Sequence, residues 1–356
     1  MARAKADGLL KTILRGAVAG VAASILLFAN VAQAQDCKLR TLASLQIVEG
    51  PGGLFLVPVT VSGKQILMIL DTGASRGVLD KTLATQLGLP LSKIATPQPI
   101  FAVPHQPTRA FETFPSQQYY LANGAKLEEL TIVPSVSLGA SQHADAAFML
   151  ANINSPDMPP LKGILGSDLL RDSDVEIDPR NGIIKLFAQD HCAGKVVYWA
   201  DAYSDLPIRI TTDGQIALTM TLDGHDVDTV LDTGAANTTL SLQIARQVFD
   251  IDTDAPTVEK ISGSGRDTVY RTHFKTLAAG GISIAAPRIY LVRDALADRL
   301  REDAADTHHL MPLLTRTPQL ILGMDVLRKL HLYIAYHESK LYITAADAGA
   351  PNSAKP

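Results

Sequence analysis

The sequence lacks the features that define several classes of protein. It has two cysteines, one tryptophan and no dense block of lysine or arginine, and its formal net charge is −4. This charge gives no support for nucleic-acid binding. Proline and glycine are not enriched enough to suggest disorder, and 47% hydrophobic with 19% charged residues is the composition of a globular protein. With 356 residues the chain is long enough for two domains, each with its own core.

The start of the chain, residues 1–34, differs from the rest. Basic residues precede an apolar run from Ala17 to Ala29, and Ala32-Gln33-Ala34 follows it. This order is typical of an export signal that is cleaved after Ala34. The run is short for a membrane span, which leaves an uncleaved anchor as the alternative. We expect an exported protein, periplasmic or secreted, with no stable membrane span after cleavage.

The two cysteines are Cys37, near the expected mature start, and Cys192, at the end of the first half of the chain. After export both would lie in an oxidising compartment. We therefore expect a disulfide between them, with two unpaired thiols as the alternative.

The main signal is a repeated motif, Leu-Asp-Thr-Gly-Ala, at residues 70–74 and 231–235. Alternating apolar residues interrupted by a glycine turn precede each copy, which predicts a β-hairpin that runs into each motif. Ile-Leu-Gly recurs later, at residues 164–166 and 321–323, and we expect a short helix and a closing hairpin after each. The matched segments indicate the internal duplication of a whole domain.

The duplication predicts the domain organisation. Few segments have a helical period, so the class is mostly β with short helices, expected at 167–171 and 324–330. Extra segments at 141–162 and 297–318 are interpreted as surface insertions, with lids as the alternative. The boundaries are: an export signal, 1–34; an N-terminal lobe, 35–192; a linker, 193–204; a C-terminal lobe, 205–345; and a flexible tail, 346–356.

Asp71 and Asp232 are the candidate chemical groups. An ionised aspartate at the tip of a buried hairpin is costly unless charge or hydrogen bonds compensate it. Two such loops that face each other could share one proton and hold a water between the carboxylates. One carboxylate would act as general base on the water and the other as acid on the scissile carbonyl, which predicts a peptide-bond hydrolase. The residues expected to support the pair are Thr72, Gly73, Ala74, Thr233, Gly234 and Ala235.

On these residues the chain resembles the pepsin and retropepsin family of aspartic proteases, over about residues 50–345 of its length. The resemblance implies a mostly β, two-lobed acid-protease fold in which each lobe is a retropepsin-like closed β-barrel with a short helix. It implies an aspartic endopeptidase with Asp71 and Asp232 as the catalytic dyad and with no metal or cofactor. Its partners would be peptide or protein substrates, and a monomer would supply both lobes. Gly166 and Gly323 would be structural, at the ends of strands that thread beneath the loops.

The family also needs a flap that closes over the substrate. Residues 261–274 of the second half have the expected glycines and position, whereas the equivalent residues 100–114 have no glycine. Whether both lobes carry a mobile flap therefore stays open. The predicted flap residues are Ser262, Gly263, Ser264 and Gly265.

Ala74 and Ala235 stand where pepsin-like enzymes place a serine or threonine whose hydroxyl can stabilise the ionised aspartate. The dyad should therefore hold its shared proton to higher pH, with an optimum closer to neutral than that of pepsin. Asp168 and Asp325 are interpreted as helix-start or structural groups.

Three alternatives remain. An exported protein with the same fold could bind peptides or a partner without cleaving them. The halves could instead pair between two chains. Residues 73–77 also match G-x-S-x-G of serine hydrolases, but the second copy loses the serine, so the duplicated feature is the aspartate.

Overall fold

The computed structural model describes most of the chain between Cys37 and Ala348. The described ranges are 37–94, 119–120, 126–153, 161–211, 214–264, 268–293 and 318–348. Met1–Cys37 and Lys38–Pro356 form separate units, and every described helix and strand belongs to the second. The export signal, the first-half flap stretch, Gly265 and the end of the tail lie outside the described residues.

The N-terminal lobe contains a closed ring of six strands. Two of these strands, β3 and β4, form the hairpin that was predicted before the first motif. Its turn residues, Ser62 and Gly63, have φ angles of 46° and 81°, as expected for a tight two-residue turn between twisted strands. The ring closes because β9 pairs with both β10 and β3. In order around it lie β3 (Phe55–Val61), β4 (Lys64–Leu70), β11 (Gly163–Leu165), β5 (Val78–Asp80), β10 (Ser141–Ala151) and β9 (Glu129–Leu138). Short strands join or flank it: β2 (Val48–Glu49), β6 (Ser92–Lys93), β7 (Tyr119–Tyr120) and β8 (Lys126–Leu127).

The C-terminal lobe repeats this order with one difference. Its long hairpin is divided into two pairs, β20 with β23 and β21 with β22, where Ala286 has a φ of 47° and Pro287 has no N–H to donate. A closed barrel in each lobe is therefore wrong for the second lobe, because within the described ranges only the first has an uninterrupted ring. Its strands are β15 (Arg209–Ile210), β16 (Ile216–Leu222), β17 (His225–Leu231), β18 (Thr239–Ser241), β19 (Glu259–Ser262), β20 (Val269–His273), β21 (Thr276–Ala279), β22 (Ile282–Ala285), β23 (Arg288–Val292) and β24 (Leu320–Leu322).

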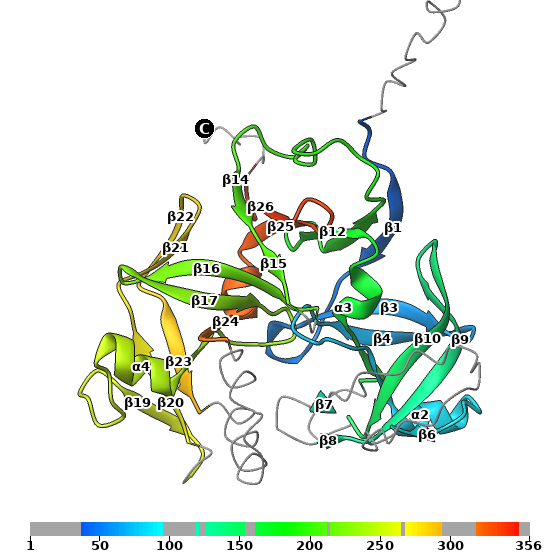
Figure 1. Cartoon of the computed structure of the whole chain (residues 1–356), viewed down its shortest axis with the longest axis horizontal. Coiled ribbons are helices and arrows are strands. Elements are labelled where there is room, and N and C mark those ends of the chain that lie inside the picture. Colours follow the sequence, from blue (N-terminus) through cyan, green and yellow to red (C-terminus); the bar gives the residue numbers. More distant parts are fainter. Residues whose placement is uncertain are drawn as a thin grey trace, which may run out of the picture. The chain divides into compact units, whose positions relative to one another are not determined.

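A six-stranded sheet joins the two halves, and the sequence did not predict it. In the middle of this shared sheet, β12 of the first half pairs antiparallel with β25 of the second, with Val175 opposite Ile334. Figure 1 shows these strands side by side. The order is β1 (Thr41–Gln46), β13 (Ile183–Phe187), β12 (Asp174–Asp178), β25 (Leu330–Ala335), β26 (Lys340–Ala345) and β14 (Ser204–Pro207). Trp199 of the predicted linker stacks on His331 of β25, with ring centroids 3.9 Å apart.

The described helices are short. They are η1 (Pro51–Gly53), α2 (Lys81–Gln86), α3 (Ser167–Leu170), α4 (Leu242–Phe249) and α7 (Met324–Leu327). The helix predicted to reach residue 330 ends three residues earlier, because β25 begins at Leu330. The insertion predicted at 141–162 is also wrong for residues 141–151, which form the barrel strand β10. Residues 154–160 and 294–317 lie outside the described ranges.

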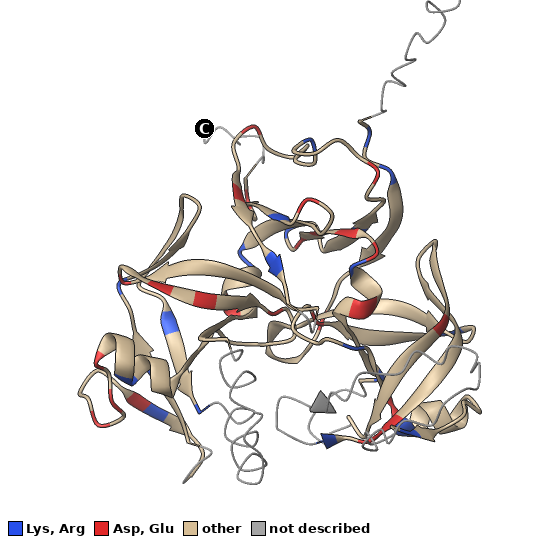
Figure 2. Ribbon diagram, viewed as in Figure 1, with Lys and Arg blue, Asp and Glu red and all other residues tan. Residues whose placement is uncertain are grey.

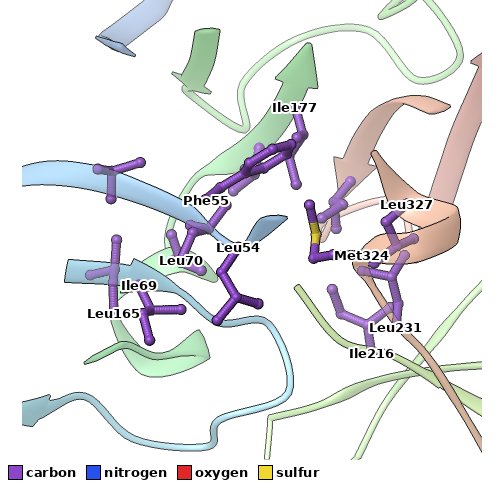
Figure 3. Packing of buried hydrophobic residues seen from close by; sticks show 14 of the residues in the cluster. Leu54, Phe55, Ile69, Leu70, Leu165, Ile177, Ile216, Leu231, Met324 and Leu327 are labelled. Carbon is purple, nitrogen blue, oxygen red and sulfur yellow. The ribbon is translucent and has the colours of Figure 1, made fainter. Parts of the chain in front are cut away.

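Apolar side chains of both halves form one buried cluster. Figure 3 shows Leu54 and Leu70 of the first half on one side of the view and Met324 and Leu231 of the second half on the other. All four side chains are buried. The two halves therefore share a core as well as a sheet, which limits how far the motif loops can move relative to each other.

Three further predictions can be compared with the described residues. Cys37 and Cys192 are both disulfide-bonded. Basic side chains are scattered among acidic ones over the ribbon (Figure 2). None of the helices in the described ranges is both long and apolar enough to cross a membrane.

Candidate active site

Each Asp-Thr-Gly loop leaves a buried strand and is supported by a parallel neighbour. The loop that carries Asp71 follows β4, and the Asp71 N–H donates to the Leu165 carbonyl at 3.0 Å. The loop that carries Asp232 follows β17, and its N–H donates to the Leu322 carbonyl at 3.0 Å. The Ile-Leu-Gly segments therefore thread beneath the two loops.

Gly166 and Gly323 end these threading strands at places where only a glycine fits. A Cβ at position 166 would lie 2.5 Å from the carbonyl carbon of Arg76, and one at position 323 would lie 2.5 Å from that of Asn237. Contacts this short do not occur between packed atoms. The close passage lets the next residue in each half, Ser167 or Met324, donate its N–H to the alanine carbonyl of the loop, at 2.9 and 2.8 Å.

Thr72 and Thr233 connect the loops by a reciprocal set of hydrogen bonds. Each backbone N–H donates to the other residue's Oγ1 at 3.1 Å. The Thr72 hydroxyl donates to the Leu231 carbonyl at 2.8 Å, and the Thr233 hydroxyl donates to the Leu70 carbonyl at 2.7 Å. Both side chains are buried. The predicted bonding between threonines across the halves is therefore present.

The carboxyl groups of Asp71 and Asp232 are in contact at the centre of this arrangement. A Cβ at Gly73 would lie 2.5 Å from Asp232 Oδ2, and one at Gly234 would lie 2.5 Å from Asp71 Oδ1. Each glycine thus makes room for the carboxylate of the opposite half. Two like charges so close together in a buried site oppose each other, which favours a pair in which one of the two carboxyl groups carries a proton.

The surroundings of the pair favour retention of that proton. Burial raises the pKa of Asp71 well above its usual value, and the nearby charge of Asp232 raises it further. Burial also raises the pKa of Asp232. Backbone donors oppose the effect: Gly73 and Ala74 donate to Asp71 Oδ1 at 2.9 and 2.8 Å, and Gly234 donates to Asp232 Oδ1 at 2.8 Å. The pair can hold one shared proton beside one ionised oxygen.

Asp168 and Asp325 fix the end of each loop from the first turn of the short helices. Asp168 Oδ1 accepts the Gly77 N–H at 3.0 Å, and Asp325 Oδ1 accepts both the N–H and the hydroxyl of Thr238, at 2.8 and 2.7 Å. Burial raises the pKa of Asp168 to about 6, although Arg76 nearby lowers it. Their interpretation as structural groups agrees with these contacts.

The predicted flap of the second half is partly described. Its strands β19 and β20 pair antiparallel, and Ser262, Gly263 and Ser264 are exposed at the end of β19. Arg271 donates across the hairpin to Glu259 at 2.7 Å. The described part therefore has the hairpin form expected of a flap.

Sequence reasoning missed a contact between the lobes at the site. Gln215 Nε2, just ahead of β16, donates to the Gly73 carbonyl at 2.7 Å. A long polar side chain before a strand carries no local signal of such a contact. Alignment of the two motifs would have directed attention to this position, because its counterpart is the apolar Leu54.

One cluster on the shared sheet has side chains of the kind that bind metals. Ligand atoms of Glu176, Asp178 and His331 lie within 4.8 Å of one another and are buried. These atoms already have partners: His331 Nε2 is 3.0 Å from Glu176 Oε1, and Asn181 donates to both oxygens of Asp178, at 3.1 and 2.7 Å. An ion would have to displace these bonds, so we assign no metal to this cluster.

A mostly β, two-lobed fold in which each lobe contributes an aspartate to one carboxyl pair defines the acid-protease-like class. The aspartyl protease family model matches residues 57–101 and 218–326, which include both motifs. These matches place the chain in the aspartyl protease family. No curated protein matches the chain.

Solved structures with similar folds are distant in sequence. A basic 7S globulin from soybean is 10% identical with a TM-score of 0.44, over 89% of this chain and 98% of its own. Conglutin gamma, a basic 7S globulin from lupine seeds, is 12% identical with a TM-score of 0.47, over 86% and 95%. A retropepsin-like aspartic protease from Rickettsia conorii is 14% identical with a TM-score of 0.29, over 42% and 96%. All three TM-scores are below 0.5, so these likenesses carry no argument about this chain.

Proposed function

We propose that the protein is an aspartic endopeptidase that hydrolyses peptide bonds with a water held between Asp71 and Asp232. The observation that carries this proposal is the interleaving of the two loops, in which each carboxyl group occupies the space left by the glycine of the opposite half. A purely structural aspartate would not need a second buried carboxylate beside it, because two like charges in one site oppose each other. Contact between the two carboxyl groups costs free energy unless the pair keeps one proton. A pair with one shared proton offers both the base and the acid that peptide-bond hydrolysis needs.

The proposed reaction begins with one carboxylate ionised and the other protonated. The ionised group removes a proton from the water as its oxygen attacks the scissile carbonyl carbon, and the protonated group donates its proton to the carbonyl oxygen. The resulting tetrahedral diol collapses when the C–N bond breaks. The ionised carboxylate takes a proton from one hydroxyl as the new carbonyl forms, and the protonated carboxyl group donates its proton to the leaving amine, so the pair again holds one proton.

The pH range of activity follows from the burial of the pair. Because burial raises the pKa of both Asp71 and Asp232, the shared proton is lost only at higher pH than for exposed aspartates. Ala74 and Ala235 add no hydroxyl that would stabilise the ionised form. We therefore expect cleavage to extend toward neutral pH. Activity confined below about pH 3 would contradict this explanation.

The test is cleavage of a random peptide mixture by the chain without residues 1–34, followed by mass spectrometry. Asp71→Asn and Asp232→Asn should each lower cleavage by roughly a thousandfold or more, because each variant leaves the pair without one of its two functions. Asp226→Asn is the matched control, since Asp226 lies on β17 but is exposed, and it should cleave like the wild type. If wild-type chain binds peptides without cutting them, the non-catalytic alternative replaces this proposal.

We also propose that the protein works outside the cytoplasm, in the periplasm or as a secreted protein. Support comes from the basic, apolar and Ala-Gln-Ala order of residues 1–34 and from the disulfide-bonded state of both cysteines, which suits an oxidising compartment. Fractionation of expressing cells with an antibody against the C-terminal lobe tests it. Recovery of the full-length chain in the cytoplasm alone would contradict it.

A further inference from the structure

The two loops of the carboxyl pair are not equivalent. When Asp71 is aligned with Asp232, Gln215 of the second half corresponds to Leu54 of the first. Gln215 Nε2 donates across the lobes to the Gly73 carbonyl at 2.7 Å, whereas Leu54 is a buried apolar side chain with no donor. Only the loop that carries Asp71 can therefore receive a side-chain donor from this position.

The bond acts on the peptide that also contacts Asp71. The Gly73 carbonyl and the Ala74 N–H belong to one peptide group, and that N–H donates to Asp71 Oδ1 at 2.8 Å. A donor on the carbonyl polarises a peptide and makes its N–H a stronger donor. The Ala74 N–H favours the ionised form of Asp71, and a donor on the Gly73 carbonyl strengthens that effect.

Gln215 is held in place for this contact. Its N–H donates to Thr211 Oγ1 at 3.1 Å, and its carbonyl accepts the Thr211 N–H at 2.9 Å. Gly214 has a φ of 82°, and a Cβ there would lie 2.7 Å from Ser167 Oγ of the first half. Gly214 thus packs against the N-terminal lobe, and the Gln215 side chain next to it reaches the loop of Asp71.

We propose that Gln215 is a cross-lobe positioning residue that holds the Gly73–Ala74 peptide against Asp71 and keeps the pair in its singly ionised form at lower pH. The inference rests on the proposed function only for its kinetic consequences. The effect on the proton of the pair exists whether or not a peptide is cut.

The decisive variants differ in what they offer the Gly73 carbonyl. Gln215→Leu copies the residue of the other lobe and removes the donor. Its acidic limb of kcat/KM should move up by roughly half a pH unit, if the lost polarisation is ~10–30% of a charged hydrogen bond. We expect kcat about tenfold lower from imperfect placement of the carboxylate, with KM within about twofold. Gln247→Leu, on the exposed face of α4, is the matched control and should change neither.

Gln215→Glu separates positioning from general packing. An ionised glutamate would place an oxygen against the Gly73 carbonyl, but a protonated one can donate to it. As the pH is lowered, the activity of Gln215→Glu relative to the wild type should therefore increase. Over the same change in pH, the relative activity of Gln215→Leu should decrease. The opposite slopes also keep the test valid if the leucine variant folds poorly, because glutamate preserves shape. Parallel slopes for both variants would overturn the proposal.

NMR of the carboxyl carbons measures the protonation of the Asp71–Asp232 pair directly, without any substrate being cleaved. With signals assigned from Asp71→Asn and Asp232→Asn, the first deprotonation of the pair should occur about half a pH unit higher in Gln215→Leu than in the wild type. Identical titration of the two proteins would overturn the role of Gln215. A shifted titration in a protein that cleaves nothing would instead support Gln215 and contradict the proposed function.

Discussion

Asp168→Asn should change how stability depends on pH. The Asp168 side chain is only 10% exposed, and burial raises its pKa from 3.8 to about 6 against the opposing effect of Arg76. The folded protein therefore binds this proton more tightly than the unfolded chain does. Its stabilising contribution is fully present below pH 3.8 and is lost as pH rises through about 6. A shift of ~2 pKa units corresponds to about 3 kcal/mol in the free energy of unfolding.

Asparagine keeps the shape of the side chain, and its carbonyl oxygen can still accept the Gly77 N–H, but it does not titrate. The stability of Asp168→Asn relative to the wild type should therefore increase by about 3 kcal/mol between roughly pH 3.5 and 7.5. Urea unfolding at several pH values measures this difference, and other titrating groups cancel because both proteins contain them. Asp226→Asn, an exposed substitution, should give a far flatter difference. A pH-independent difference for Asp168→Asn would show that the buried carboxyl is not the cause.

Two further substitutions test the loops. Thr72→Val leaves the Leu231 carbonyl and the Thr233 N–H buried without partners, so we expect the free energy of unfolding to decrease by about 2–4 kcal/mol. Thr72→Ser keeps the hydroxyl and should lose far less. Equal losses in the two variants would refute the role of the hydroxyl. Gly323→Ala places a Cβ 2.5 Å from the backbone of Asn237 and should cost more than ~2 kcal/mol and most of the cleavage activity. Gly182→Ala, whose Cβ would meet nothing within 4 Å, should cost only about 1 kcal/mol from its positive φ, and a Gly323→Ala protein as stable as that control would contradict the close passage.

Local patterns in the sequence predicted the parts of the molecule that depend on neighbouring residues. The hairpins of β3–β4 and β16–β17 were readable because their apolar residues alternate around a glycine turn. The threonine contacts and the roles of Gly166 and Gly323 followed from the resemblance, since both copies of the motif match a pattern with known geometry. These features repeat in the chain, so each copy supported the interpretation of the other.

Other parts depend on contacts that no local pattern records. Residues 141–162 were interpreted as an extra segment ahead of the Ile-Leu-Gly strand, but residues 141–151 form β10, which pairs with β5 and β9. The prediction of a closed barrel was wrong for the second lobe, because its long hairpin is divided into two pairs of strands at Ala286 and Pro287. Gln215 could not be assigned because its partner, Gly73, lies in the other lobe. Pairing between distant segments is set by packing, which periodicity does not contain.

The shared sheet explains why a carboxyl pair built from two lobes can hold its geometry. The threonine bonds contribute about 1 kcal/mol each, which is too little to fix the position of two lobes. The pairing of β12 with β25 adds a continuous ladder, and separation of the halves would expose both strands as edges. Tyr333 on β25 is completely buried, so the same separation would also expose a large aromatic side chain. Because one chain carries both halves, their encounter is intramolecular and needs no second subunit to complete the Asp71–Asp232 pair. Substitutions that break the β12–β25 ladder should therefore abolish the pair even though they lie outside both loops.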